Sequence, residues 1–385
     1  MYKKSDYIVR GCVFMNNQIR PRHKKLASLM IYATDLCDSA CKHCLIWAKR
    51  PVVFLPKEEI FKIVKSNCIN KFTKIGLEGG EFLLHPEALD ILKWFTENHS
   101  NFDLLSNCLQ PDKLIDAVRR YPPKRLWISL DGPADTYKSM RGKDGYYKVI
   151  KVIEELNAIV PISLMFTLSP YNDFNDLKHV LSVAKLYAID IRVGIYNNID
   201  FFDTVDKAHL GDLGAHKNEA PLTFKSVNIV QEQKKTDPQH DTVISFEEWK
   251  SKIPDNLKDF EENFDFVLLY NLWKQQQLTI RCFSIFDNAI VLPNGDVPLC
   301  QNLPTKLGNT YHSSLNEILN SAATIKTQKF HSENCNKCWI NYHRKQDIVL
   351  YRNLEKLFGK KATTKIFGYY QWNNAQQSYH EIVES

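Results

Sequence analysis

The chain has 385 residues, 44% of them hydrophobic, and a formal net charge of +6. This length and apolar fraction place it in the globular class, with room for one large domain and a smaller one. The positive excess is small and acidic residues lie among the basic ones, which argues against a dedicated nucleic-acid groove and favours a solvated surface or a small anionic ligand.

The sequence predicts a cytoplasmic protein. It contains no run of 18 apolar residues, so no membrane span is expected. Its first 17 residues lack the long apolar segment of a secretory signal. In a reducing compartment the ten cysteines are not expected to form disulfides, and their grouping along the chain indicates metal ligation instead.

Strand-like and helix-like segments alternate between residues 26 and 200. Short apolar runs predict six strands, over 26–33, 74–78, 102–106, 125–130, 162–168 and 190–196. Amphipathic spacing predicts helices beginning at 56 and over 86–99, 114–120, 149–156 and 175–187. Six such units predict an α/β fold in which helices cover a parallel sheet. Chemistry in such folds lies at the carboxyl ends of the strands.

The other segments set the expected domain boundaries. Residues 1–25 form an N-terminal extension and 26–200 form the core. Residues 201–265 are polar and turn-rich, which predicts an insertion or linker. Residues 266–340 hold the second cysteine group and form a small domain. Residues 341–385 form a helical and aromatic tail, which we expect to pack on the surface of the core.

The first cysteine group, Cys37, Cys41 and Cys44, directly follows the first predicted strand. Thiolates at the spacing C-x3-C-x2-C can wrap one loop around a cubane iron–sulfur cluster. Three ligands for four irons leave one iron open to a cofactor or substrate. The alternative is a zinc site that takes His43 or His23 as a distant fourth ligand, although zinc sites more often pair two C-x2-C knuckles.

The second cysteine group combines a hairpin signal, Asn294-Gly295, with a C-x2-C knuckle. Between them, Ser314 and Glu317 predict a capping box that opens a short helix. Four thiolates brought together in this way make a closed site, for which a structural zinc ribbon is the alternative. The four cysteines are Cys282, Cys300, Cys335 and Cys338. The remaining ones, Cys12, Cys68 and Cys108, are expected to be structural.

Two stretches resemble the radical S-adenosylmethionine (SAM) superfamily: "CDSACKHC" after the first strand and "EGGE" after the second. The resemblance implies a partial (β/α)6 TIM-like barrel. It also implies that Cys37, Cys41 and Cys44 ligate a [4Fe-4S] cluster whose fourth iron is chelated by SAM. One departure is His43, where the family usually has an aromatic residue before the third cysteine.

The resemblance also implies a cofactor pocket. Gly79 and Gly80 let the backbone approach a ligand closely, and the Glu81 carboxylate can accept a hydrogen bond from an amine. Alone, these three residues would more often form a turn than a site. Polar residues at later strand ends give softer matches, and strand-end caps or an Arg–Asp pair explain them equally well. These residues are Ser106, Asn107, Ser129, Asp131 and Arg141.

The C-terminal cysteines resemble the auxiliary-cluster extensions called SPASM and twitch. No cysteine follows Cys338, so the resemblance implies one auxiliary [4Fe-4S] cluster, held by the four cysteines of the second group. The implied cofactors are therefore SAM, the SAM-binding cluster and this auxiliary cluster. The implied partner is a low-potential electron donor such as flavodoxin or ferredoxin.

The resemblance implies reductive cleavage of SAM to a 5′-deoxyadenosyl radical, which abstracts a hydrogen atom from a substrate. We expect oxidation or epimerisation of a sugar-like or other small metabolite, because only about 25 residues precede the first strand, too few for a peptide-recognition domain. The alternatives are a maturase of ribosomally made peptides and a non-catalytic iron–sulfur or zinc protein. The sequence does not identify a catalytic base. Neither a membrane nor a nucleic acid is expected as a binding partner.

Overall fold

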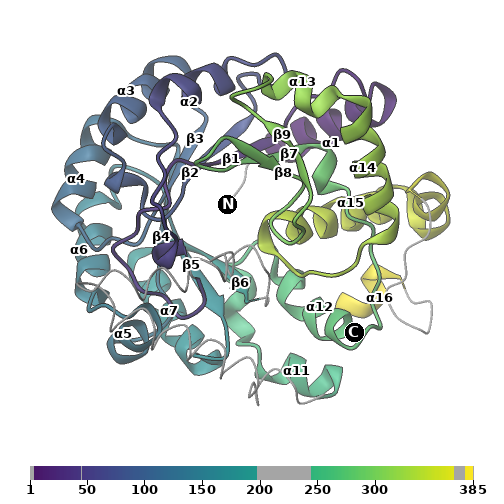
Figure 1. The fold of residues 1–385 in the computed structure, drawn as a ribbon. Helices are drawn as coiled ribbons and strands as arrows, with labels where there is room; N and C mark the ends of the chain where they lie inside the picture. The colour runs from purple at the N-terminus through teal and green to yellow at the C-terminus, as the bar shows by residue number, and fades with distance from the viewer. Residues whose placement is uncertain (1–3, 45, 197–243, 368–377, 385) are drawn as a thin grey trace.

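A computed structural model describes residues 4–44, 46–196, 244–367 and 378–384. Its centre is a seven-stranded sheet in the order β6-β5-β4-β3-β2-β1-β7, with every pair parallel. The sheet curls into an open barrel with helices on its outer side (Figure 1). This confirms the predicted α/β half-barrel. The strands are β1 Ser28–Tyr32, β2 Lys74–Glu78, β3 Phe102–Ser106, β4 Arg125–Ser129, β5 Ile162–Leu168, β6 Asp190–Ile195 and β7 Asn288–Val291.

The helices fall into two sets. Those between β1 and β6 surround the sheet (Figure 1), and they are α2 Lys57–Val64, α3 Ala88–Asn98, α4 Pro111–Arg120, α5 Ala134–Arg141, α6 Tyr146–Leu156 and α7 Phe174–Tyr187. The second set lies on the side where the edge strands β6 and β7 face each other, and its main members are α12 Phe264–Lys274, α14 Ala322–Asn334 and α15 Asn341–Phe367. Within the described part of the chain, no helix has the length and apolar character needed to cross a bilayer.

The seventh strand was not predicted. β7 pairs with β1 in the register Ser28↔Asn288 to Ile31↔Val291 and is buried along its whole length. The predicted turn is present, with Gly295 at a φ of +80°. The next strand, β8 (Asp296–Pro298), nevertheless pairs with β9 (Lys306–Asn309). An unpaired edge at β1 would leave buried backbone donors unsatisfied, and β7 satisfies them.

Alternation along β2 shows how the sheet separates its two faces. Ile75 and Leu77 are fully buried against the helices. Lys74, Gly76 and Glu78 point the other way and line a cavity inside the barrel. Because side chains of a strand alternate in direction, Lys74 and Glu78 place charged groups on the inner face of the sheet, among apolar side chains such as Leu105 and Met165. The half-barrel therefore has a cavity lined by charged and apolar side chains, whereas side-chain layers fill a complete barrel.

Several segments outside the predicted core are packed against it. The N-terminal extension forms α1 (Lys4–Ile19), and Phe14 on it is 3% exposed. Of the predicted insertion, residues 201–243 lie outside the described part. The remainder forms α11 (Phe246–Lys252) and a short 3-10 helix (Asp255–Asp259), which bury Trp249 and Leu257 in the main core.

The end of the chain is described in part. α13 (Leu315–Asn320) opens with the predicted capping box of Ser314 and Glu317. The tail continues as α16 (Tyr379–Glu384), on which Tyr379 is buried and its backbone N–H donates to the Glu355 carboxylate. Residues 368–377 of the aromatic tail lie outside the described part.

Leu77→Ala should lower the free energy of unfolding by about 2–5 kcal/mol, because it opens a cavity in a fully buried layer. The matched control is Leu186→Ala on α7, where the leucine is 74% exposed and the change should stay within about 0.5 kcal/mol. Urea unfolding of both variants measures the difference, and equal losses would contradict the assignment of the β2 core face.

Candidate active site

The loop after β1 carries the first three thiols and is tied to the end of α5. The backbone N–H of Ala40 donates to the carbonyl of Arg141 at 3.0 Å, and that of Lys42 donates to Met140 at 2.9 Å. Ser39 Oγ donates to the same Arg141 carbonyl at 3.2 Å. These bonds hold the loop across the carboxyl ends of the strands.

Cys37, Cys41 and Cys44 all line one cavity of about 320 Å³. Burial, together with the neighbouring Cys41, raises the pKa of Cys44 to about 12. Burial and Cys41 likewise raise the pKa of Cys37 well above its usual range. The free side chains are therefore neutral thiols at pH 7. Cluster ligands must be thiolates, so loading would release protons.

The donor set fits an iron–sulfur cluster, in which each cysteine binds a different iron. Among the residues that the structure describes, no three His, Cys, Asp or Glu side chains come close enough to share a single ion. His43 lines the cavity and its Nδ1 is buried without a hydrogen-bond partner, while burial lowers the pKa of His43 to about 4. His23 is exposed and lies outside the cavity lining, so it is not placed to complete a zinc site.

Gly79 and Gly80 lie against the thiol loop itself. The backbone N–H of Gly80 donates to the Thr34 carbonyl, and that of Glu81 donates to the Leu36 carbonyl, both at 2.7 Å. A Cβ on Gly79 would lie 2.5 Å from the Thr34 oxygen, and one on Gly80 would collide with the Leu36 carbonyl. Gly79 also has a φ of +148°, which favours glycine. The close approach that these glycines permit in the structure is to the loop backbone.

Glu81 is buried at the cavity wall and held by the end of β3. Its carboxylate accepts from Ser106 Oγ at 3.0 Å and from the backbone N–H of Asn107 at 2.8 Å. Burial raises the pKa of Glu81 to about 7, although these two bonds lower it. Two bonds leave lone pairs on the carboxylate unused, so Glu81 can also accept from a bound ammonium group. The side-chain amide of Asn107 donates to Asp38 at 2.8 Å and lies 3.8 Å from Cys37 Sγ.

Of three other predicted residues, two line the cavity and the third lies behind them. Ser129 and Arg141 line the cavity, and Arg141 Nη1 lies 3.8 Å from Cys41 Sγ. Asp131 does not line the cavity. Its carboxylate accepts from Arg141 Nε at 2.6 Å and from the backbone N–H of Thr167 at 2.8 Å. Asp131 therefore orients the guanidinium beside the thiols.

Glu78 is a candidate residue that the sequence analysis did not single out. It is the first letter of "EGGE" and lies on the cavity side of β2. Among the described residues its carboxylate has no hydrogen-bond or ion-pair partner. Burial raises the pKa of Glu78 to about 7, with Arg192 acting against the shift and Asp103 adding to it. The sequence does contain a signal for Glu78. It lies two residues after Gly76 and four after Lys74, so strand alternation places all three on the same face of β2.

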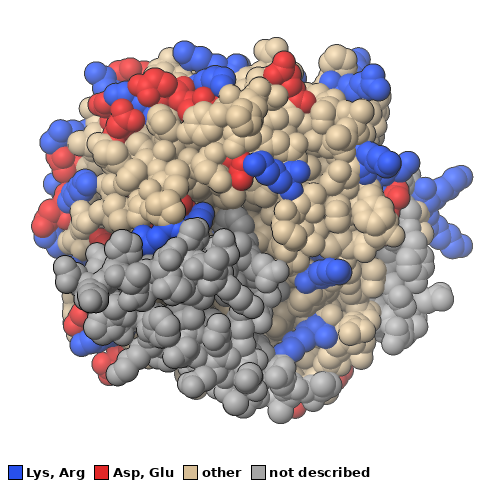
Figure 2. Space-filling view, in the orientation of Figure 1, with Lys and Arg blue, Asp and Glu red and all other residues tan. Residues whose placement is uncertain are grey.

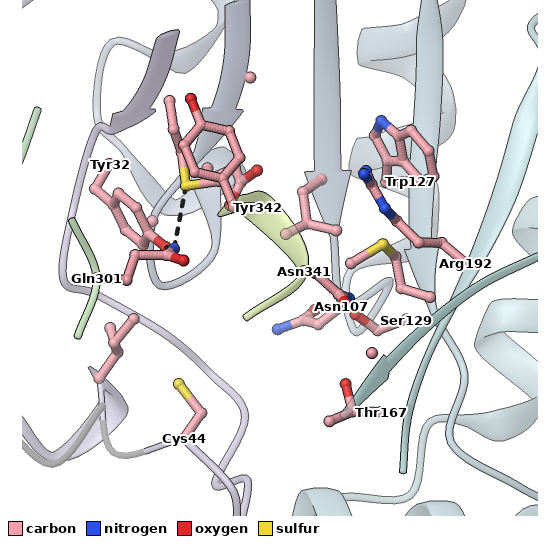
Figure 3. A pocket seen from close by; sticks show the side chains of 18 of the residues that line it. Tyr32, Cys44, Asn107, Trp127, Ser129, Thr167, Arg192, Gln301, Asn341 and Tyr342 are labelled. Atoms are coloured by element: carbon pink, nitrogen blue, oxygen red, sulfur yellow. Dashed lines mark hydrogen bonds between the residues drawn. The ribbon is translucent and has the colours of Figure 1, made fainter. Parts of the chain in front are cut away.

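The cavity wall opposite the thiols is charged and aromatic. Asp103 accepts from Trp127 Nε1 at 2.9 Å and pairs with Lys74 Nζ at 3.0 Å. Arg192 lies over the Trp127 ring, 5.1 Å from its centroid, and Figure 3 shows the two side chains together.

Residues next to the second cysteine group line the same cavity. Gln301, which follows Cys300, donates to Tyr32 OH at 2.9 Å, and Figure 3 shows this pair on the side of Tyr342. Tyr342 and Asn341, near Cys338, also point into it. The space-filling view shows this face of the molecule hollowed at its centre (Figure 2). Both cysteine groups thus flank one cavity.

The four C-terminal cysteines lie shortly before a 3-10 helix, two residues after β8, directly after α14 and three residues before α15. Cys282 and Cys300 share one buried cluster. Burial, with smaller contributions from Cys338 and Cys335, raises the pKa of Cys300 to about 11. The four cysteines are Cys282, Cys300, Cys335 and Cys338.

A buried cation accompanies the second group. The Arg344 side chain is 1% exposed and donates to the carbonyls of Cys338 and Ile280, both at 3.0 Å. The Cys282 and Cys338 thiols raise the pKa of Arg344, although burial opposes them. Asp347 lies 3.5 Å from the guanidinium. A fixed positive charge among four thiolates offsets the negative charge that they bring to a cluster.

Comparisons with known proteins agree with this layout. Residues 31–184 match the model of the radical SAM superfamily, and residues 282–339 match SPASM, an iron–sulfur cluster-binding domain. GTP 3′,8-cyclase of Clostridium botulinum is 27% identical over 178 residues, which cover 44% of this chain and 56% of that protein. The subtilosin biosynthesis protein AlbA of Bacillus subtilis is 22% identical over 303 residues, or 76% of this chain and 59% of AlbA. The matches thus span less than two thirds of either relative.

Solved structures share the fold. SuiB of Streptococcus suis bound to S-adenosylmethionine superposes with a TM-score of 0.55 at 14% identity, covering 92% of this chain and 81% of SuiB. SuiB bound to the precursor peptide SuiA gives a TM-score of 0.53 at 15% identity, covering 85% and 72%. At this identity the likeness extends to the fold alone.

Gly80→Ala should lower the free energy of unfolding by about 1–3 kcal/mol, because the added methyl group collides with backbone rather than with a flexible side chain. The same variant should bind less iron. Gly11→Ala on α1 meets nothing within 4 Å and serves as control, with unchanged or slightly higher stability. Thermal unfolding and iron content measure both variants, and equal behaviour would contradict the proposed contact.

Glu78→Gln should change how stability depends on pH. Because the pKa of Glu78 is raised from 4.5 to about 7, its protonation stabilises the folded wild type below pH 4.5, and this contribution is lost as the pH rises through 7. The loss is at most about 3 kcal/mol, at about 1.4 kcal/mol per pKa unit. Urea unfolding between pH 5 and 8 should show the wild type losing stability relative to the variant. The contribution of Glu81 to the pH dependence is the same in both proteins, so it does not affect the difference. Parallel curves would contradict the shift.

Proposed function

This chain carries a radical SAM domain followed by a SPASM domain, and from that premise we propose that it oxidises a small polar metabolite by hydrogen-atom abstraction. Radical SAM proteins with this second domain use SAM, a SAM-binding [4Fe-4S] cluster and auxiliary iron–sulfur ligation, together with a reductant. The observation that carries the substrate proposal is the cavity of about 320 Å³ with polar and charged side chains on its walls.

In this proposal, Cys37, Cys41 and Cys44 hold the SAM-binding cluster, and the four C-terminal cysteines hold the auxiliary one. When bound, SAM and the first cluster supply a 5′-deoxyadenosyl radical that removes a hydrogen atom from the substrate, and the second cluster supplies an acceptor for one electron. Gly79 and Gly80 keep the thiol loop and Glu81 at a fixed separation, and Glu81 accepts from the SAM amine. Arg141, oriented by Asp131, places a positive charge beside Cys41.

We assign Glu78 as the base that accepts a proton from the substrate. When a CH–OH group loses a hydrogen atom and one electron, a proton must also leave the hydroxyl oxygen for a carbonyl to form. Glu78 lies on the cavity wall with its carboxylate unpaired among the described residues. The pKa of about 7 that burial gives Glu78 suits transfer near neutral pH. Arg192 faces the same space and can bind a hydroxyl or an anionic group of the substrate.

Oxidation fits the cavity better than epimerisation. An epimerase must return a hydrogen atom to the substrate, for which a thiol with its weak S–H bond is a suitable donor. The three thiols that line the cavity are the proposed cluster ligands, and Cys108 is buried outside the lining. No thiol among the described cavity residues is left for this role.

Peptide maturation is a second candidate. AlbA is named for subtilosin biosynthesis, and SuiB has been solved with a precursor peptide. Both similarities extend over three quarters or more of this chain, whereas the match to GTP 3′,8-cyclase covers 44%. A cavity of this size could admit one side chain of a peptide. Deuterium transfer into 5′-deoxyadenosine from labelled sugars or from labelled peptides separates the two.

Cys41→Ala should reduce dithionite-driven formation of 5′-deoxyadenosine to background, because one ligand of the SAM-binding cluster is lost. Cys12→Ala is the matched control, since Cys12 is exposed on α1 and outside the cavity. Anaerobic wild-type protein should hold about eight irons, as expected for two cubane clusters. Normal turnover by Cys41→Ala would refute the ligand assignment, and zinc in place of iron would favour a non-catalytic protein.

A further inference from the structure

A second cavity, of about 530 Å³, lies at the opposite end of the barrel. Its lining includes Ala27, Lys74, Asn101 and Lys124, each of which lies immediately before or at the start of a strand. It therefore opens at the amino ends of the strands, whereas the thiols lie at the carboxyl ends. In barrel enzymes this amino end usually serves stability rather than chemistry, so a chamber there calls for a separate explanation.

The chamber is lined by cations. Six basic side chains from widely separated segments face it, and none of its described lining residues is Asp or Glu. The six are Arg10, Lys71, Lys74, Lys124, Arg192 and Lys345. Two of them form ion pairs with carboxylates outside the lining: Lys74 with Asp103 at 3.0 Å, and Lys345 with Glu261 at 2.6 Å.

Two of the other cations, Lys124 and Arg10, make no ion pair with a residue that the structure describes. Lys124 Nζ donates to the neutral amide oxygen of Asn101 at 2.8 Å. Arg10 is partly buried and makes no hydrogen bond or ion pair with any described residue. Like charges that line one cavity repel each other, and a bound anion would reduce that repulsion. Guanidinium and ammonium donors match the oxygens of a phosphate group.

We propose that this chamber binds a phosphate-type anion carrying two or more negative charges. Asn101, Asn263 and Gln346 add neutral hydrogen-bonding groups to its wall. Arg10, Lys74 and Arg192 line this chamber and the active-site cavity alike, so the two spaces meet at these three side chains. The anion is either a free ion or the phosphate end of a larger molecule whose remainder extends toward the thiols.

The test is isothermal titration of the full-length, cluster-loaded protein at low ionic strength, with inorganic phosphate and with glucose 6-phosphate, in the absence of SAM. We expect saturable binding that weakens as salt is added. The double variant Lys71→Gln/Lys124→Gln should weaken anion binding at least about tenfold, because each substitution removes one charge-assisted hydrogen bond to the anion. These two lysines are exposed, so the variant should fold, and unchanged iron content and circular dichroism confirm it.

Lys326→Gln/Lys329→Gln on α14 is the matched control, because it removes the same charge from exposed positions outside the chamber. It should bind as the wild type does. Tighter binding of glucose 6-phosphate than of phosphate assigns the anion to a larger ligand, and equal binding assigns it to a free ion. Absence of saturable binding, or equal weakening in both double variants, overturns the proposal. Formation of 5′-deoxyadenosine is measured separately, so its failure counts only against the proposed function.

Discussion

The site depends on the close backbone approach between the segment after β2 and the loop after β1. Two hydrogen bonds of 2.7 Å, from Gly80 to Thr34 and from Glu81 to Leu36, continue the contact between these strands beyond their ends. They form only because neither glycine carries a Cβ. This contact sets the thiol loop and the Glu81 carboxylate in one fixed relation. The geometry of any group held by both therefore follows from the backbone and not from flexible side chains.

A second constraint comes from alternation along the parallel strands. The helix-facing positions are apolar and hold the sheet to its outer layer, which leaves the inner positions free to be polar. Buried charges are tolerated there because most are paired, as Lys74 is with Asp103 and Arg141 is with Asp131. Glu78 is the exception among the described carboxylates of the cavity wall. An unpaired carboxylate in the cavity that the proposed cluster ligands also line is a cost that substrate chemistry would explain.

Local sequence signals predicted most of the core. The six core strands were predicted to within two residues at each end, because each is an apolar run long enough to stand out between turn signals. β7 was missed for a physical reason: its four residues lie in front of an Asn-Gly turn, which also fits the first strand of a hairpin. The polar composition of the segment from 246 to 265 predicts an insertion or linker and does not indicate that Trp249 and Leu257 anchor it in the core.

The sequence by itself determined the chemistry available: two groups of thiols, a glycine pair beside a carboxylate, and strands in an order that only a parallel sheet satisfies. Covalent spacing fixes such features, because three cysteines within eight residues stay together in any fold. Tertiary structure alone decided which polar side chains face the cavity, placing Glu78 on its wall and Asp131 behind Arg141. It also decided that cations as distant in the chain as Arg10 and Lys345 share one chamber. Their proximity depends on strand pairing and helix packing between remote segments, which no local pattern records.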